Sequence, residues 1–150
     1  MSASPFDGEY EPPSQGWVRK QVERYEASGG TEANTLMDTG IPIIVMTTVG
    51  ARSGKVRKVP LMRVEHGGEY ALVASKGGTP ENPGWYHNLT SMPRVRIQDG
   101  ATPREYDVTE LSGDERQAWW DRAVAQFPPY GEYQHKTART IPVFKATPRA

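Results

Sequence analysis

The stretch "IPIIVMTTVGARSGKVRKVPLMRVEHGGEYALVAS", residues 41–75, decides the fold class of this 150-residue chain. Its first part, residues 41–48, is a continuous and largely β-branched apolar run, which predicts a buried strand. Residues 56–66 and 69–75 predict two more strands, and Gly67-Gly68 between them predicts a tight hairpin turn. Strands that follow one another through hairpins indicate an antiparallel sheet.

The same pattern continues toward the C-terminus. Residues 94–98 and 104–111 predict a fourth and a fifth strand around an Asp99-Gly100 turn. Residues 140–146 predict the last strand. Helices are inserted late among these strands, so we expect an α+β protein, mainly an antiparallel barrel or closed sheet with peripheral helices.

Capping residues indicate where most of the helices begin. The expected helices run from Ser14 to about residue 28, before Gly29-Gly30; from the Asn82-Pro83 pair to before Pro93; from a Ser112/Glu115 capping box to about Phe127; and, for one or two turns, through residues 130–137. Residues 1–13 are rich in proline, serine and acidic residues and predict a flexible N-terminal arm. Residues 14–150 are then a single domain with one core.

Composition excludes several classes of function. The 18 basic and 18 acidic residues cancel, which argues against a dedicated nucleic-acid binder. The chain has no cysteine, so disulfides, thiolate nucleophiles and iron–sulfur clusters are excluded. The three histidines (His66, His87 and His135) lack the spacing of metal ligands, and no metal is expected. With no signal peptide and no apolar run near the roughly 20 residues of a membrane span, we expect a cytoplasmic protein.

A basic loop at residues 49–58 is the clearest candidate site. Gly50 and Gly54 free backbone N–H groups, and arginine suits phosphate or carboxylate through its bidentate fork. Strand alternation places Arg57 and Lys58 on opposite faces, so only some of the cations can meet one ligand. The cations of this loop are Arg52, Lys55, Arg57 and Lys58. The alternative is a solvated basic hairpin without a ligand.

Two further segments are candidates. In "VASKGGTPENPGWY", residues 73–86, the backbone amides between Ser75 and Gly78 could hydrogen-bond a flat polar heterocycle, or the segment could be an ordinary loop after a strand. Tyr130 and Tyr133 share a helical face, and their hydroxyls could donate a hydrogen bond or a proton. With Phe127 they could instead be a core patch with hydroxyls at its rim.

Three linked motifs carry a resemblance to a known family. In order, they are "TTVGARSGKVRKVPL" (residues 47–61), "GGEYALVASKGGTPENPGWYHNL" (residues 67–89) and "RTIPVF" (residues 139–144). The chain resembles the deazaflavin-dependent nitroreductase family, the A branch of the F420H2-dependent reductases. The resemblance implies a split β-barrel related to flavin-binding barrels. It also implies coenzyme F420, a deazaflavin with a phosphate and an oligoglutamate tail, whose reduced form donates hydride.

The family motifs also imply roles for individual residues of this sequence. The anionic part of F420 would be held by the basic loop and the start of the following strand, at Arg52, Ser53, Gly54, Lys55, Arg57, Lys58 and Pro60. The ring would lie along Ala74, Ser75, Lys76, Gly77, Gly78 and Trp85. The substrate pocket would contain Met62, Phe127, Tyr130 and Tyr133, and the catalytic hydroxyls would be those of Tyr130, Tyr133 and Ser75.

Three departures from the family's nitro-reducing pattern bear on the acceptor. The chain has Ala51 where that pattern has arginine, and it has Met62 and Phe127 where that pattern has tyrosine. Because two pocket hydroxyls are missing, quinones and activated C=C bonds, such as those of enones and lactones, are favoured over nitroaromatic acceptors.

Three alternatives remain open. An FMN-dependent oxidoreductase could use the same barrel. A non-catalytic protein could bind or carry F420. The helix at residues 14–28 could hold the protein at the inner membrane face, although its polar face mixes charges of both signs.

Overall fold

The computed structural model describes residues 4–149, so residues 1–3 of the expected arm lie outside the described residues. The sheet contains seven strands: β1 (Ile43–Val49), β2 (Val56–Met62), β3 (Glu65–His66), β4 (Glu69–Val73), β5 (Arg94–Gln98), β6 (Pro103–Glu110) and β7 (Val143–Pro148). The helices are α1 (Gly16–Ala27), α2 (Gly84–Ser91), α3 (Gly113–Gln126) and α4 (Pro129–Lys136), with 3-10 turns η1 (Pro5–Asp7) and η2 (Lys76–Gly78).

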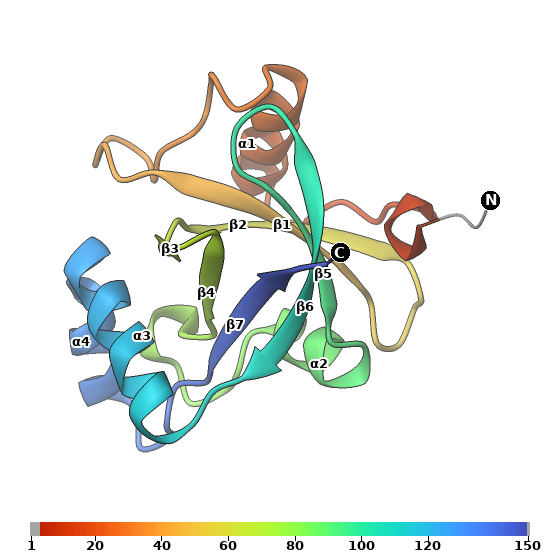
Figure 1. The fold of residues 1–150 in the computed structure, drawn as a ribbon. Helices are drawn as coiled ribbons and strands as arrows, with labels where there is room; N and C mark the ends of the chain where they lie inside the picture. The colour runs from red at the N-terminus through yellow and green to blue at the C-terminus, as the bar shows by residue number, and fades with distance from the viewer. Residues whose placement is uncertain (1–3, 150) are drawn as a thin grey trace.

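The strands form one antiparallel sheet in the order β2-β1-β5-β6-β7-β4-β3, curled into an open half-barrel (Figure 1). Helix α1 covers the β1–β2 side, α2 lies near β1, and α3 and α4 lie together beside β4 and β7. The predicted α+β class and mainly antiparallel split barrel are confirmed. Gly67 and Gly68 both have positive φ (61° and 83°) at the predicted hairpin turn.

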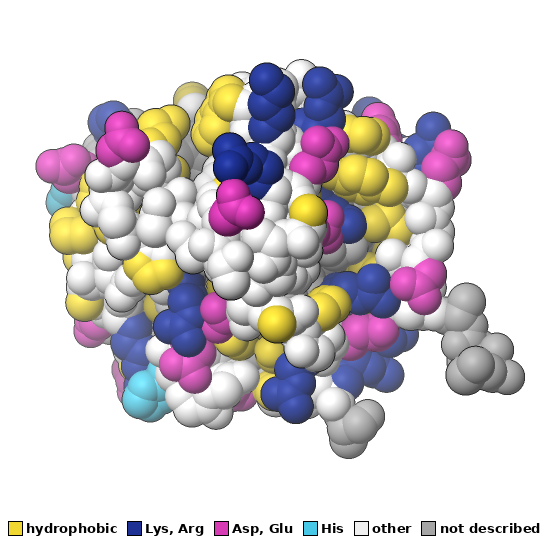
Figure 2. Space-filling model, turned by 90° about the horizontal axis from the view of Figure 1, so that it is seen from above, with side chains coloured by type: hydrophobic (Ala, Val, Ile, Leu, Met, Phe, Trp, Pro, Cys, Tyr) yellow, Lys and Arg dark blue, Asp and Glu magenta, His cyan; other side chains and the backbone are white. Residues whose placement is uncertain are grey.

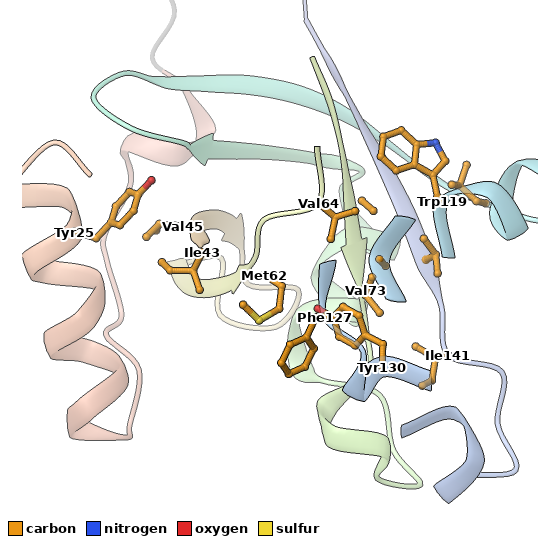
Figure 3. Packing of buried hydrophobic residues seen from close by; sticks show 14 of the residues in the cluster. Tyr25, Ile43, Val45, Met62, Val64, Val73, Trp119, Phe127, Tyr130 and Ile141 are labelled. Atoms are coloured by element: carbon orange, nitrogen blue, oxygen red, sulfur yellow. The ribbon is translucent and has the colours of Figure 1, made fainter. Parts of the chain in front are cut away.

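Both faces of β1 are buried, which explains why its sequence is continuously apolar rather than alternating. Ile43 and Val45 belong to one core cluster, which also contains side chains of α1, α3 and α4 (Figure 3). Ile44 and Met46 point into a second cluster that includes Leu89 of α2. The sheet therefore separates two apolar layers, each closed by its own helices.

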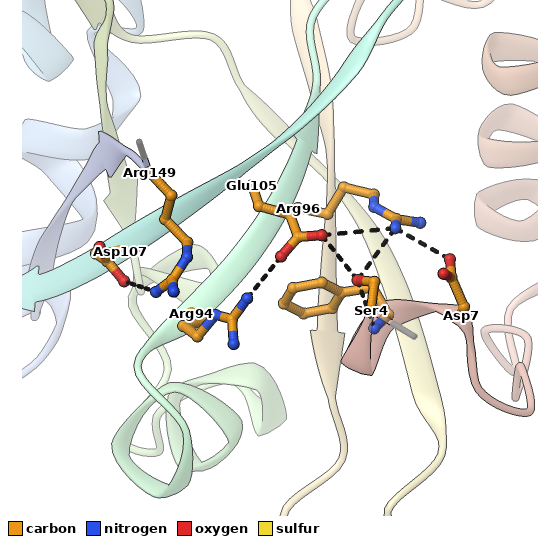
Figure 4. A network of polar contacts seen from close by, with 8 residues as sticks. Ser4, Asp7, Arg94, Arg96, Glu105, Asp107 and Arg149 are labelled. Atoms are coloured by element: carbon orange, nitrogen blue, oxygen red, sulfur yellow. Dashed lines mark hydrogen bonds and ion pairs between the residues drawn. The ribbon is translucent and has the colours of Figure 1, made fainter. Parts of the chain in front are cut away.

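The N-terminal arm was expected to be flexible, but its described part packs on the sheet. Phe6 is only 3% exposed. Asp7 pairs with Arg96, whose guanidinium also contacts Ser4 and Glu105 (Figure 4). These partners lie about 90 residues away in the sequence, so local composition alone could not reveal the docking.

The predicted capping interactions are absent at three helices, although Ser112 does occupy the N-cap position of α3. Helix α1 begins at Gly16 after Gln15, and Ser14 does not cap it. Ser112 precedes α3 but makes no capping hydrogen bond, because Gly113 starts the turn with φ +60° and Glu115 binds Lys145 instead. Helix α2 begins after Pro83, since the Asn82 side chain accepts a hydrogen bond from Arg139. At α2 and α3 a competing partner takes the predicted capping side chain: Arg139 binds Asn82, and Lys145 binds Glu115.

Charged side chains of both signs are interspersed on the face shown in Figure 2, as the balanced composition predicts. Within residues 4–149, no helix is both long and apolar enough to cross a membrane.

The end of α1 is fixed against the β5–β6 turn. The Tyr25 hydroxyl donates to the carbonyl of Gln98 (3.1 Å) and accepts from the amide of Gly100 (2.8 Å), and burial raises the pKa of this phenol. Beside it, Gly30 has φ +79°, and a Cβ there would lie 2.7 Å from the Gly100 Cα. The two backbones can approach this closely because position 30 has no side chain.

We predict that Gly30→Ala lowers the free energy of unfolding by about 2–5 kcal/mol, through left-handed strain and the clash together. Gly29→Ala is the matched control. Gly29 also has positive φ (+64°), but its Cβ would meet Ala101 at an ordinary 3.7 Å. We therefore expect a loss of only about 1–2 kcal/mol for the control. Urea denaturation of both variants measures the difference, and equal losses would show that the close approach to Gly100 is unimportant.

Candidate functional site

A cleft of about 800 Å³ opens at the edge of the sheet where β2 meets α1 and α2. Its walls come from five parts of the chain: the end of the arm with the start of α1, the end of β1, the β1–β2 loop, β2, and α2. The lining residues are Glu11, Pro13, Ser14, Gln15, Val18, Thr48, Gly50, Ala51, Arg52, Ser53, Arg57, Lys58, Val59, Gly84, Trp85, His87 and Asn88. The cleft thus brings the predicted basic loop and Trp85 together, although more than 25 residues separate them in the sequence.

The β1–β2 loop is tightly folded by its own backbone. Gly50 N–H donates to the carbonyl of Lys55 (2.8 Å), and Gly54 N–H donates back to the carbonyl of Gly50 (3.0 Å). The Ser53 hydroxyl accepts from the amide of Lys55 (3.1 Å). A Cβ at position 50 would lie 2.7 Å from that hydroxyl oxygen, so a side chain there would require the Ser53 hydroxyl to move and give up its bond to Lys55.

Asn88 of α2 ties this loop to the helix, and sequence reasoning missed it. Its side-chain amide donates to the Thr48 hydroxyl (3.0 Å) and its carbonyl oxygen accepts from the amide of Ala51 (2.9 Å). Asn88 lies three residues after Trp85, so both side chains share one face of α2. The three-residue spacing of Trp85 and Asn88 within "GWYHNL" was the feature of the sequence that could have identified Asn88 as a site residue.

The four predicted cations have different environments. Within residues 4–149, Arg52 is exposed and makes no ion pair. Arg57 pairs with Glu11 (3.2 Å). Lys58 donates to Glu26 of α1 (2.6 Å), and it lines the same cleft as Arg57, although strand alternation predicts opposite faces for the two. Of the cations that line the cleft, Arg52 is therefore the one most available to bind a ligand.

Not every residue predicted for the anionic part reaches this cleft. Arg52, Ser53, Arg57 and Lys58 line it. Gly54, Lys55 and Pro60 lie outside the lining, and Lys55 instead approaches Glu9 at 4.0 Å.

The predicted ring-binding loop follows β4 and has an unusual backbone. Lys76, Gly77 and Gly78 have consecutive positive φ values of 45°, 65° and 80°. The preceding Ala74 and Ser75 are buried. Within residues 4–149, the backbone N–H groups of Lys76 and Gly77 make no hydrogen bond, which leaves two adjacent donors available to a ligand.

Arg139 holds this loop in place. Its guanidinium donates to the carbonyl oxygens of Thr79 (2.9 Å), Ala74 (3.1 Å) and Ser75 (2.7 Å), and to the side-chain oxygen of Asn82 (2.8 Å). Burial lowers the pKa of this guanidinium, but arginine stays charged at any physiological pH. Arg139 begins the "RTIPVF" motif, but the sequence alone does not indicate this anchoring role.

Helix α4 packs directly on the same loop. A Cβ at Gly78 would lie 2.6 Å from the carbonyl oxygen of Tyr133, so the backbone of α4 touches the loop at a glycine. Tyr133 itself is half-buried at the margin of the core. The structure therefore brings Tyr133 to the predicted ring-binding loop.

The other residues predicted for a substrate pocket lie inside the core. Met62, Phe127 and Tyr130 are 7%, 8% and 5% exposed (Figure 3). The Tyr130 ring stacks edge-on against Phe127 at 4.9 Å, and burial raises the pKa of its hydroxyl. This arrangement matches the alternative of a core patch with a hydroxyl-bearing rim. None of these three, nor Ala74 to Gly78, lines the 800 Å³ cleft.

No group of three or more histidine or acidic side chains within residues 4–149 is arranged to hold a metal ion.

Comparison with known proteins agrees with this architecture. The sequence profile of the F420H(2)-dependent quinone reductases matches residues 17–148. An F420H(2)-dependent quinone reductase of Mycobacterium tuberculosis is 36% identical over 113 residues, which cover 72% of this chain and 74% of the relative.

Two solved structures are more similar in sequence. One, described as a domain-swapped dimer, is 51% identical and superposes with a TM-score of 0.69, covering 87% of this chain and 96% of its own. The other, described as an F420-H2 dependent reductase, is 55% identical with a TM-score of 0.67, covering 70% of this chain and 93% of its own. The half-barrel, the glycine-bearing basic loop and these matches together lead to one conclusion: the chain belongs to the F420H(2)-dependent quinone reductase family.

Proposed function

We propose that this protein transfers a hydride from F420H2 to a planar, electron-poor acceptor, foremost a quinone. Membership of the family makes the chain an F420H2-dependent reductase; the acceptor is the part that is proposed. One observation carries the proposal: a single 800 Å³ cleft joins Arg52 and Arg57 to Trp85. A volume of this size suits a ligand with several connected groups.

The donors of the structure fit the two ends of F420. The phosphate and carboxylates of the cofactor suit Arg52 and Arg57, because guanidinium binds such groups through paired N–H donors. The deazaflavin ring carries hydrogen-bond acceptors at its polar edge, which suit the free amides of Lys76 and Gly77. Lys58 is a weaker candidate, since Glu26 already holds it.

Bound F420H2 supplies the hydride, so the protein needs no redox centre of its own. What remains for the protein is to position both reactants and to provide hydrogen bonds and a proton to the acceptor. Tyr133 is the leading candidate for the proton donor, because its side chain is only half-buried and its backbone touches the ring-binding loop. Tyr130 suits a different role: its buried hydroxyl, like any tyrosine hydroxyl at neutral pH, can act as a neutral hydrogen-bond donor. Ser75, which is 8% exposed, is a third candidate.

The chain's apolar residues bear on the acceptor. Met62 and Phe127 supply no hydroxyl next to Tyr130. A quinone, or an enone or lactone C=C bond, gains charge at one oxygen on reduction and needs few donors. We therefore expect nitroaromatics to be poorer acceptors than quinones or activated C=C bonds.

The direct test is a titration of the purified protein with F420 and with FMN, followed by the oxidation of F420H2 with menadione, a coumarin and a nitroaromatic. We expect a preference for F420 and fastest turnover with menadione. Preference for FMN would contradict the proposal. Tight F420 binding without turnover on any acceptor would favour the carrier alternative.

The two tyrosines can be separated by mutation. We predict that Tyr133→Phe lowers kcat for menadione by at least about 10-fold, since a positioned general acid contributes this much or more. The affinity for F420 should change little, because the hydroxyl acts on the acceptor. Tyr130→Phe is the matched comparison and should lower kcat less. Steady-state kinetics measures both effects. If Tyr130→Phe lowers kcat more than Tyr133→Phe does, the proton donor is Tyr130 instead.

A further inference from the structure

The described part of the N-terminal arm forms a short parallel bridge with the first residue of β2. Glu11 N–H donates to the carbonyl of Val56 (2.9 Å), and Val56 N–H donates to the carbonyl of Glu9 (2.7 Å). Because the bridge uses backbone groups, it fixes where the side chains on either side of Tyr10 lie. Glu9 comes to lie 4.0 Å from Lys55, and Glu11 lies 3.2 Å from Arg57.

The two ion pairs are exposed and not equivalent. The side chains of Arg57 and Glu11 are 41% and 44% exposed, so water screens their attraction and the pair is worth little to stability. Only the Glu11–Arg57 pair lines the cleft; Glu9 and Lys55 lie outside it. Glu11 therefore places a carboxylate on the arginine that is proposed for the anionic part of F420.

We infer that Glu11 is an internal competitor for Arg57, which the anionic part of F420 must displace on binding. This inference rests on the proposed function. A carboxylate offers the same bidentate geometry to guanidinium as the carboxylates and phosphate of the cofactor. Arg57 is then paired with Glu11 in the free protein and with the cofactor in the complex. Because the Glu11 pair must be broken first, the net free energy gained on binding F420 is smaller.

The physical consequence is faster exchange of the cofactor. Each turnover uses up one F420H2, so oxidised F420 must leave before the next can bind. A competing carboxylate beside the departing anion re-pairs Arg57 and favours release. Glu11 thus sets the affinity and the residence time, and the hydride-transfer step does not depend on it.

The test is Glu11→Gln, which removes the charge, keeps the size and leaves the backbone bridge intact. We expect the Kd for F420 to fall about 3- to 5-fold, as for the removal of one exposed ion pair. The dissociation rate measured by stopped-flow should fall by a similar factor. Glu32→Gln is the control, because Glu32 makes an even more exposed pair with Arg24 (2.8 Å) outside the cleft. It should change neither quantity.

A double-mutant cycle with Arg57→Ala identifies the competed group. In the Arg57→Ala background, Glu11→Gln should no longer tighten F420 binding. An equal gain in that background would show a general charge effect and overturn the inference, as would an unchanged or raised Kd in the Glu11→Gln variant. Failure of wild type and all variants to bind F420 would instead overturn the proposed function, and the inference with it.

Discussion

The proposed ring site depends on the hydrogen bonds that the guanidinium of Arg139 donates. Four hydrogen bonds from this one side chain reach the carbonyl oxygens of Ala74, Ser75 and Thr79 and the side chain of Asn82. Without it, three backbone carbonyls of a partly buried loop would lose a charged partner, which is costly. Two backbone hydrogen bonds, from Gly78 N–H to Ser75 and from Thr79 N–H to Lys76, and the contact of Gly78 with α4 also shape this loop. Arg139 adds the charged partner that holds the two ends of the loop to the fold.

The same principle governs the basic loop. There Asn88 reaches from α2 to Thr48 and Ala51, and holds the basic loop through one side-chain amide. Both loops thus contain glycines and are tied to the fold by a distant polar residue. Loops of this kind can present backbone N–H groups to a ligand while staying ordered, which a loop of glycines alone could not do. The curled sheet supplies the rigid frame from which both loops emerge.

Sequence reasoning predicted the sheet well because its signals are local. The apolar run of β1 and the Gly67-Gly68 turn act on their immediate neighbours, and both were found as expected. Strand alternation was a poorer guide at Arg57 and Lys58, since both line the same cleft. The cleft also brings the basic loop together with Trp85; the roles that the family motifs imply for these residues stay predictions.

Long-range partners explain what the sequence did not predict. The docking of the arm depends on Arg96 and Glu105, and the loss of the Asn82 cap depends on Arg139. In the sequence, Asn88 and Arg139 do not stand out from other polar residues. Their roles become visible only in the fold, where Asn88 binds the amide of Ala51 and Arg139 binds backbone carbonyls. Tyr130 illustrates the reverse case: a hydroxyl that the pattern places in a pocket lies in the core, at 5% exposure.

The most direct test of this account is residue-resolved amide hydrogen exchange of Lys76 and Gly77, with and without F420. These two N–H groups are free in the protein and are proposed to bind the ring edge. We predict that F420 slows their exchange by about 10-fold or more in the wild type, and by much less in Arg139→Lys, where lysine cannot reproduce the four hydrogen bonds. Protection confined to residues 50–58, with Lys76 and Gly77 unchanged, would contradict the claim that the loop held by Arg139 is a wall of the cofactor site.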